Sequence, residues 1–262
     1  MSASRISLSG VNLHYPSTAY APSSLVTMLG QVIKRGGRSV PLKDIHALKS
    51  VTAEIGTGER VALLGHNGAG KSTFLKTVAG LYPISSGRLN VEGSVRSLFD
   101  ISLGFEPDAT GRANILYRCL LMGLHPRYVR EREPEIVAFA DLGEFIDYPL
   151  STYSAGMQVR LAFAISTFAG GDILLLDEVI GAGDASFMVR ARARIAELVR
   201  QSEIMVLASH DLNAVESLCD RGLVFHHGEL AFDGPVAKAI AAYRDMNGLD
   251  LNGSTSNGRA NG

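Results

Sequence analysis

Residues 65–73 read Gly-His-Asn-Gly-Ala-Gly-Lys-Ser-Thr, and they limit the folds open to this chain more than any other segment. They meet the pattern G-x-x-x-x-G-K-[ST] of a phosphate-binding loop. An apolar run at 60–64 precedes them, and the segment 73–79 that follows has helical spacing. Because the pattern requires a strand before it and a helix after it, this context supports a site for a nucleoside triphosphate.

Each part of this loop has a defined role toward phosphate. Glycines allow backbone N–H groups to turn inward and hold phosphate oxygens, and the following helix directs its positive end at the same anion. Lys71 would reach the β- and γ-phosphates of ATP, and the Ser72 hydroxyl would hold Mg²⁺. The other loop residues expected to contact ATP are Gly65, His66, Asn67, Gly68, Ala69, Gly70 and Thr73.

Composition narrows the class of protein. A chain of 262 residues suits one large domain or two small ones. The net charge of −1, from 25 basic and 26 acidic residues, leaves no basic excess for a nucleic-acid partner. Cys119 and Cys219 lie far apart in no metal-binding or redox spacing, which favours a reducing cytosol. We expect no signal peptide and no membrane-spanning segment, so a separate chain would have to cross the membrane.

The hydrophobic pattern predicts alternating strands and helices, and hence a parallel α/β sheet covered on both faces. Residues 4–15 alternate as a strand does. Residues 47–65 are typical of a hairpin with its turn at 56–59. A helical region is expected from 112 to 150, with breaks near Pro126, Pro134 and Pro149. We also expect helices at 72–80, 155–169 and 186–201 and strands at 87–99, 173–177 and 204–209.

Two further segments stand out from this alternation. Apolar residues recur at helical spacing over about 23–35, which predicts a short amphipathic helix with a basic end. Its apolar face would pack on the core of its own domain or dock on a membrane surface or partner. The tail at 247–262 is mostly Asn, Gly and Ser, which predicts disorder.

Polar residues at two predicted strand ends supply the rest of a nucleotide site. Asp177 and Glu178 follow a buried strand, at the edge where open α/β sheets bind ligands. Asp177 could hold Mg²⁺, and Glu178 could polarise an attacking water. His210 ends the next strand and would face the γ-phosphate. Small residues at 154–156 open a helix, either as an ordinary cap or as a second phosphate contact.

In order and spacing these motifs resemble those of ATP-binding cassette (ABC) transporter ATPases, over roughly residues 4–245. The family's signature matches residues 153–157, within which Ser154, Ala155 and Gly156 would contact ATP. The D-loop matches the segment ending at Asp184, and the switch histidine matches His210. Tyr15 stands where the family places an aromatic residue that stacks on adenine.

The resemblance implies a fold as well as a site. It implies a P-loop NTPase with a RecA-like α/β core, a β-subdomain and an inserted helical subdomain at about 100–158. The ATP-binding domain would span residues 1–246.

A narrower resemblance points to the ATPases of bacterial polysaccharide exporters. The phrases at 102–115, 152–164 and 177–187 are similar to theirs, as is the extra helix within 16–44. That subfamily serves O-antigen, capsule and teichoic-acid export. Some of its members carry a carbohydrate-binding domain after the cassette, and this chain resembles the short form.

Three departures from the ABC pattern affect the assignments. The chain has no glutamine between Gln31 and Gln158, so no residue is assigned to the usual link between Mg²⁺ and the permease. Ala155 and Met157 replace the usual signature glycine and glutamine. Val179 stands where most members have proline, as it does in the export subfamily.

The resemblance implies a homodimer that closes head to tail over ATP and Mg²⁺ and drives an integral-membrane permease. The cargo would be a lipid-linked polysaccharide, and the chain would lie peripherally on the cytoplasmic face of the inner membrane. The alternatives are an ABC exporter with another cargo, a nucleotide-gated binding module with incidental hydrolysis, and a soluble ABC protein of translation or DNA repair.

Overall fold

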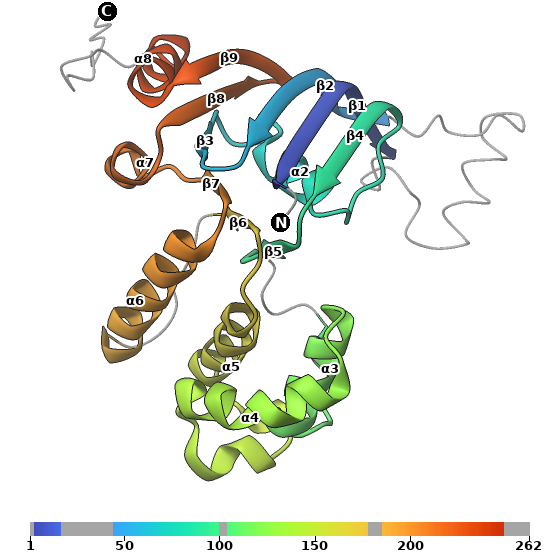
Figure 1. Cartoon of the computed structure of the whole chain (residues 1–262), viewed down its shortest axis with the longest axis vertical. Coiled ribbons are helices and arrows are strands. Elements are labelled where there is room, and N and C mark those ends of the chain that lie inside the picture. The colour runs from blue at the N-terminus through green and yellow to red at the C-terminus, as the bar shows by residue number, and fades with distance from the viewer. Residues whose placement is uncertain (1–2, 17–43, 100–103, 178–184, 249–262) are drawn as a thin grey trace, which may run out of the picture.

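The computed structural model describes residues 3–16, 44–99, 104–177 and 185–248 (Figure 1). The predicted helix at 23–35, Glu178, Asp184 and the tail from 249 onward lie outside these residues. None of the described helices is both long and apolar enough to cross a membrane.

A six-stranded sheet forms the centre of the described chain, with the strand order β5-β6-β7-β3-β8-β9. The first five strands are parallel, and β9 runs antiparallel to β8. This confirms the predicted α/β class with a parallel sheet. The strand bounds are Arg60–Leu64 for β3, Val95–Ser97 for β5, Ile173–Asp177 for β6, Ile204–Ala208 for β7, Arg221–His226 for β8 and Glu229–Pro235 for β9.

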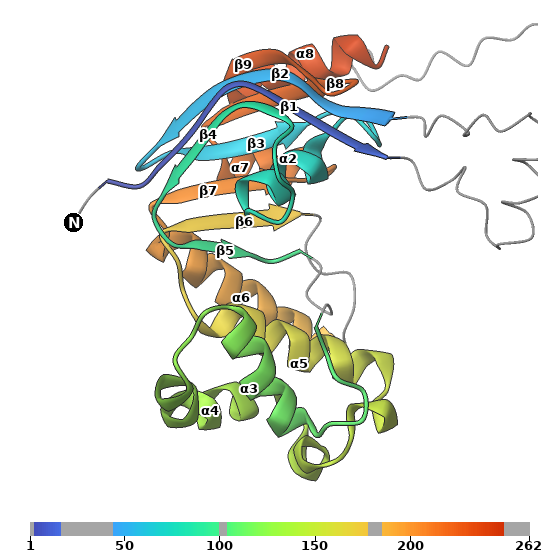
Figure 2. The same ribbon diagram turned by 90° about the vertical axis from the view of Figure 1, so that its right-hand side faces the viewer.

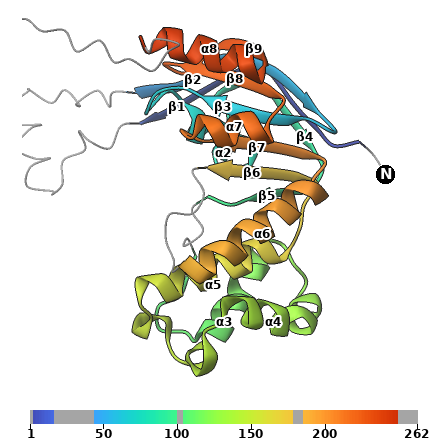
Figure 3. The ribbon, with the colours of Figure 1, turned by 90° about the vertical axis from the view of Figure 1, so that its left-hand side faces the viewer.

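Alternate side chains of the central strands build two separate cores, because successive residues of a strand point to opposite faces. On one face, Val61 and Leu63 pack with helix α2 (Lys71–Val78). On the other, Ala62 and Leu64 pack with α6 (Ala185–Gln201), α7 (Leu212–Leu218) and α8 (Val236–Met246). Figures 2 and 3 view these faces from opposite sides, with α2 in front in Figure 2 and α7 in front in Figure 3.

A second sheet of three antiparallel strands covers the face that carries α2. Its order is β2-β1-β4, with bounds Asp44–Gly56, Arg5–Pro16 and Ser86–Glu92. The hairpin expected at 47–65 is therefore wrong, since β2 pairs with β1 while β3 joins the other sheet. The turn at 56–59 does form, but it carries the chain from one sheet to the other, because β3 is buried on both faces and needs neighbours on both sides.

Helices gather at the end of the molecule away from the three-stranded sheet (Figures 1 and 2). They are α3 (Gly111–Leu121), α4 (Pro126–Ala140) and α5 (Ala155–Phe168), with 3₁₀ turns at Gly143–Asp147 and Leu150–Thr152. Their shared apolar cluster includes Ile115, Ile136 and Ile165. The break expected near Pro134 is wrong, because Pro134 lies within α4. Burial of Val129 and Ile136 on either side offsets the backbone hydrogen bond that proline cannot donate.

Candidate functional site

A cavity of about 660 Å³ opens at the carboxyl ends of the central parallel strands. Its size falls within the range of about 300–1,000 Å³ that is typical of small-molecule sites. Sequence-predicted and unexpected residues line it together: Tyr15, Ile45, His46, Ala47, Lys49, Asn67, Gly68, Gly70, Lys71, Ser72, Thr73, Asp177, His210, His227 and Gly228.

Strand register explains why these distant segments meet. Leu63 of β3 lies opposite Ala208 of β7, and Ala208 lies opposite Asp177 of β6. All three strands therefore end at the same edge of the sheet. The phosphate loop leaves β3 there, Asp177 is the last residue of β6, and His210 comes two residues after β7 ends.

Two glycines give the phosphate loop a shape that other residues would resist. Gly65 has a φ of 150°, and a Cβ there would lie 2.5 Å from the carbonyl oxygen of Phe225. Gly70 has a φ of 114° and precedes the first turn of α2, where a Cβ would lie 3.0 Å from the carbonyl oxygen of Ala47. The loop can therefore pass close to neighbouring backbone and deliver the first N–H groups of α2 to the cavity. Those N–H groups have no partner within a helix, so they suit an anion.

Lys71 is held inside the curve of this loop. The residue is 8% exposed. Its Nζ donates to the carbonyl oxygens of Gly65, at 2.6 Å, and His66, at 3.2 Å. A buried ammonium requires hydrogen-bond acceptors, and these carbonyls provide them from within the loop. The positive charge is thereby fixed at the cavity wall.

Basic side chains also line the cavity. Lys49 lines it, as do His46 and His227. Burial and the neighbouring charges of His14 and Lys49 lower the pKa of His46. A nearby charge on His226, burial and the charge of His66 lower the pKa of His227. Both histidines are therefore shifted toward the neutral form, and Lys49 supplies the positive charge that suits a polyphosphate. Asp177 adds a carboxylate to the lining.

Aromatic residues flank the outer part of the cavity. Tyr15 is 37% exposed at the end of β1, and its ring lies 6.3 Å from that of Tyr82 between centroids. The rings of His14 and His46 stack with centroids 3.9 Å apart. Tyr15 thus has an accessible ring where the resemblance to ABC ATPases placed an adenine contact.

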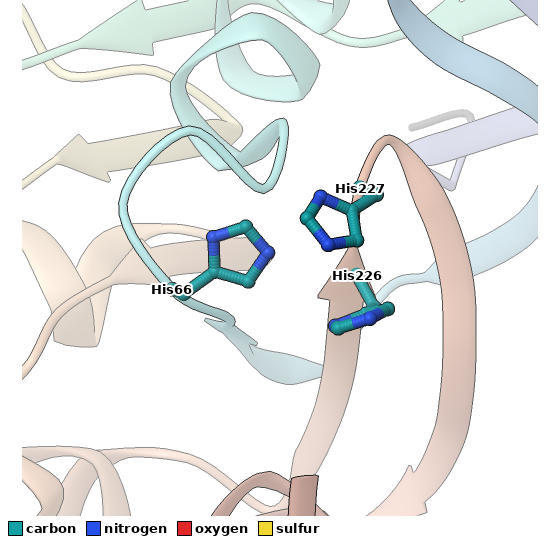
Figure 4. A group of neighbouring side chains, drawn as sticks. All are labelled: His66, His226 and His227. Carbon is teal, nitrogen blue, oxygen red and sulfur yellow. The ribbon is translucent and has the colours of Figure 1, made fainter. Parts of the chain in front are cut away.

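Three predicted loop residues do not line the cavity. Gly65 packs against the backbone of Phe225, and Ala69 is fully buried. His66 faces two further histidines, as Figure 4 shows. Their contribution to the site is the conformation of the loop.

The signature residues also lie apart from the cavity. Ser154 caps α5 and accepts a hydrogen bond from the N–H of Met157 at 3.3 Å. Ser154 and Ala155 are exposed, and Gly156 is half-buried. Apart from its chain neighbours and the backbone of its own helix, the nearest described atom to a Cβ on Gly156 would be the Ser154 hydroxyl oxygen, at 4.0 Å. This helix start is therefore open to solvent on the helical layer.

Sequence reasoning missed the contributions of β2 and of the β8–β9 turn. Ile45, His46 and Lys49 come from β2, while His227 and Gly228 form the turn. None of them lies in a recognisable motif. A two-residue gap ending in glycine between two strands does predict a tight hairpin, but only the fold shows that this hairpin borders the phosphate loop.

Comparison with known proteins agrees with this geometry. The family described as ABC transporter matches residues 48–181. The O-antigen export system ATP-binding protein RfbE of Yersinia enterocolitica is 40% identical over 221 residues, which cover 83% of this chain and 92% of that protein. The teichoic acids export ATP-binding protein TagH of Shouchella clausii is 37% identical over 203 residues. This match covers 78% of this chain and 56% of TagH.

Solved structures share the fold. A dimeric, post-hydrolysis ATP-binding cassette bound to ADP and phosphate superposes with a TM-score of 0.64. The match covers 88% of this chain and 98% of that one, at 19% sequence identity.

Proposed function

Because this chain belongs to the ABC transporter family, we propose that it is the ATP-hydrolysing subunit of an exporter for a lipid-linked polysaccharide. A separate integral-membrane permease would form the path for the cargo, with this chain bound peripherally at the cytoplasmic face of the membrane. The observation that carries the catalytic part is the shared cavity of Lys71, Ser72, Asp177 and His210 at one sheet edge.

The residues present suit ATP. Lys71 would pair with the β- and γ-phosphates, and the N–H groups at the start of α2 would receive phosphate oxygens. The exposed ring of Tyr15 would stack on adenine. Lys49 also lines the cavity and adds a further positive charge.

The donor set also suits Mg²⁺. This ion prefers hard oxygen ligands, and the Ser72 hydroxyl and Asp177 carboxylate line the same cavity. When bound, Mg²⁺ would neutralise charge on the phosphates. Ser72 and Asp177 would hold the ion in this cavity.

Two residues are assigned to the hydrolytic step. Glu178 follows Asp177 directly in the chain, so we assign it the role of polarising the attacking water. His210 lines the cavity from the end of β7, and we assign it contact with the γ-phosphate.

We further propose that a second copy of the chain completes the site. Ser154, Ala155 and Gly156 offer an exposed helix start on the helical layer, whereas the cavity lies at the sheet edge. Head-to-tail pairing would bring the helix start of each copy to the phosphate loop of the other, and a two-fold arrangement closes such contacts. Asp184 would lie at this interface, as the matched D-loop implies.

The choice of cargo rests on the relatives. RfbE is an O-antigen export protein and TagH a teichoic-acid export protein, so an O-antigen-like polysaccharide on a lipid carrier is the cargo we propose. Capsule, teichoic acid or a small lipid are alternative cargoes for the same ATPase.

The replacement Glu178→Gln tests the assigned chemistry. It keeps the size of the side chain but removes the carboxylate, so it should retain ATP binding and lower turnover by about 100-fold or more. Nucleotide binding and steady-state phosphate release should be measured on the same preparation. Turnover equal to wild type would contradict the assignment of Glu178.

Reconstitution with the candidate permease tests the transport function. A chain that powers export should hydrolyse ATP faster when the permease and a lipid-linked glycan are both present. An ATP hydrolysis rate that does not change when the permease and glycan are added would favour the nucleotide-gated binding module instead.

A further inference from the structure

Three histidines from two distant segments meet beside the phosphate loop (Figure 4). His66 is the second residue of the loop, and His226 and His227 lie where β8 turns into β9. One ring nitrogen of each lies within 4.8 Å of the others. The ring centroids are 4.7 Å apart for His66 and His227 and 5.4 Å apart for His66 and His226.

The hydrogen bonding of His66 leaves a lone pair on its Nε2 that could bind a metal ion. Its Nδ1 lies 2.8 Å from the carbonyl oxygen of Asn67, which can only accept a hydrogen bond, so Nδ1 carries the proton. In the neutral ring Nε2 then holds a lone pair. Nε2 is buried, and among the residues that the structure describes it has no hydrogen-bond partner. Fixing one imidazole nitrogen on a backbone carbonyl is how proteins orient a histidine toward a metal ion.

The backbone holds the other two histidines in place. His227 and Gly228 form a two-residue turn in which both have positive φ, 48° and 87°. The N–H of Gly228 donates to the carbonyl oxygen of Ala69 at 2.8 Å, which ties this turn directly to the phosphate loop. The three rings therefore come from a rigid junction between two elements.

We propose that His66, His226 and His227 form a binding site for a divalent transition-metal ion of the Zn²⁺ class. Imidazole suits Zn²⁺, Ni²⁺ and Cu²⁺, and three imidazoles with one open position are an established zinc geometry. Zn–N bonds of about 2.0–2.1 Å place tetrahedral ligands about 3.4 Å apart. Rotation of the exposed rings of His226 and His227 would bring their nitrogens to that spacing.

Neutral imidazole is the form that binds metal. The charge of His226 lowers the pKa of His227, followed by burial and the charges of His66 and Lys49. Lys49 itself pairs with Glu229 at 3.7 Å. Protonation of His227 is therefore disfavoured.

A bound ion would join the phosphate loop to the β8–β9 turn by covalent coordination. This site is distinct from the proposed Mg²⁺ position, which uses the oxygen ligands of Ser72 and Asp177. His66 and His227 connect it to the nucleotide cavity, since His227 also lines that cavity.

Equilibrium dialysis of the untagged full chain against Zn²⁺, with excess Mg²⁺ and no nucleotide, tests the proposal. Wild type should bind one Zn²⁺ per chain. His226 does not line the nucleotide cavity, so His226→Ala is the variant to compare. Loss of a hydrogen-bond partner behind a metal ligand already costs about 10–100-fold in affinity, so loss of the ligand itself should cost at least that much.

His14→Ala provides the matched control, because it also removes an exposed histidine but lies outside the cluster. It should bind Zn²⁺ as wild type does, and His227→Ala should repeat the loss seen with His226→Ala. The proposal is overturned if wild type binds no Zn²⁺, if His226→Ala and His227→Ala bind it unchanged, or if His14→Ala weakens binding equally.

Discussion

Lys71 is the residue on which we expect nucleotide binding to depend most directly. Its ammonium is buried and already held by two loop carbonyls, so it meets a phosphate with little reorganisation. Hydrogen bonds to charged groups contribute about 1.5–3 kcal/mol each. The charge is therefore positioned before the ligand arrives.

Replacing Lys71 by alanine should weaken ATP binding by at least about tenfold, which corresponds to about 1.4 kcal/mol. Isothermal titration with ATP measures this change. Lys76→Ala is the matched control, because Lys76 lies on the same helix but outside the cavity lining. Equal losses for both variants would mean that net charge alone governs affinity.

The sequence predicted the site residues that belong to recognisable motifs and missed the site residues that lie outside any motif. Lys71, Ser72, Asp177 and His210 were expected, and the structure brings them to one cavity. His46, Lys49 and His227 could not be predicted in this way, because their proximity depends on how β2 and the β8–β9 turn pack against the loop.

Among the elements, α6 links the helical layer to the central sheet. Phe187 of α6 is fully buried, and its ring lies 5.6 Å from that of Phe163 in α5 and 6.1 Å from that of Phe139 in α4. The same helix follows Asp177 in the chain and packs on the sheet through Leu198. Helix α6 therefore connects the central sheet with the layer that carries the signature.

Truncating this junction with Phe187→Ala should lower the free energy of unfolding by about 3–5 kcal/mol, because it leaves a cavity among aromatic rings. Urea denaturation followed by circular dichroism measures the loss. Val189→Ala serves as the control on the same helix, since Val189 is 70% exposed and should change stability by less than about 0.5 kcal/mol. A Phe187→Ala chain as stable as wild type would show that the helical layer does not depend on this contact.

The periodicity of the sequence predicted the bounds of helices and strands more accurately than it predicted which strands pair. The strand at 173–177 and the helix that begins at 155 were predicted almost as they occur. The pairing of β2 with β3 was wrong, since a short turn is compatible with a hairpin or with a crossing between sheets. Pro134 shows the reverse problem, in which tertiary burial overrides a local helix breaker.

For the whole molecule, the central question is how the exposed helix start of α5 participates in the site. The phosphate loop, Asp177 and His210 line the cavity, whereas Ser154 begins α5 in the helical layer and does not line it. The proposed dimer would bridge this separation by placing the helix start of one chain against the cavity of the other. Two chains would then share two ATP sites, and hydrolysis would let them part.

The solution mass of the Glu178→Gln chain, measured with and without Mg²⁺ and ATP, tests this claim most directly. We predict twice the mass of one chain with ATP and a single chain without it. Adding Ser154→Arg should abolish the dimer. Adding Leu121→Arg, at a 75% exposed position on the same helical layer, should preserve it. A chain that stays monomeric with ATP, or a dimer that survives Ser154→Arg, would contradict the account.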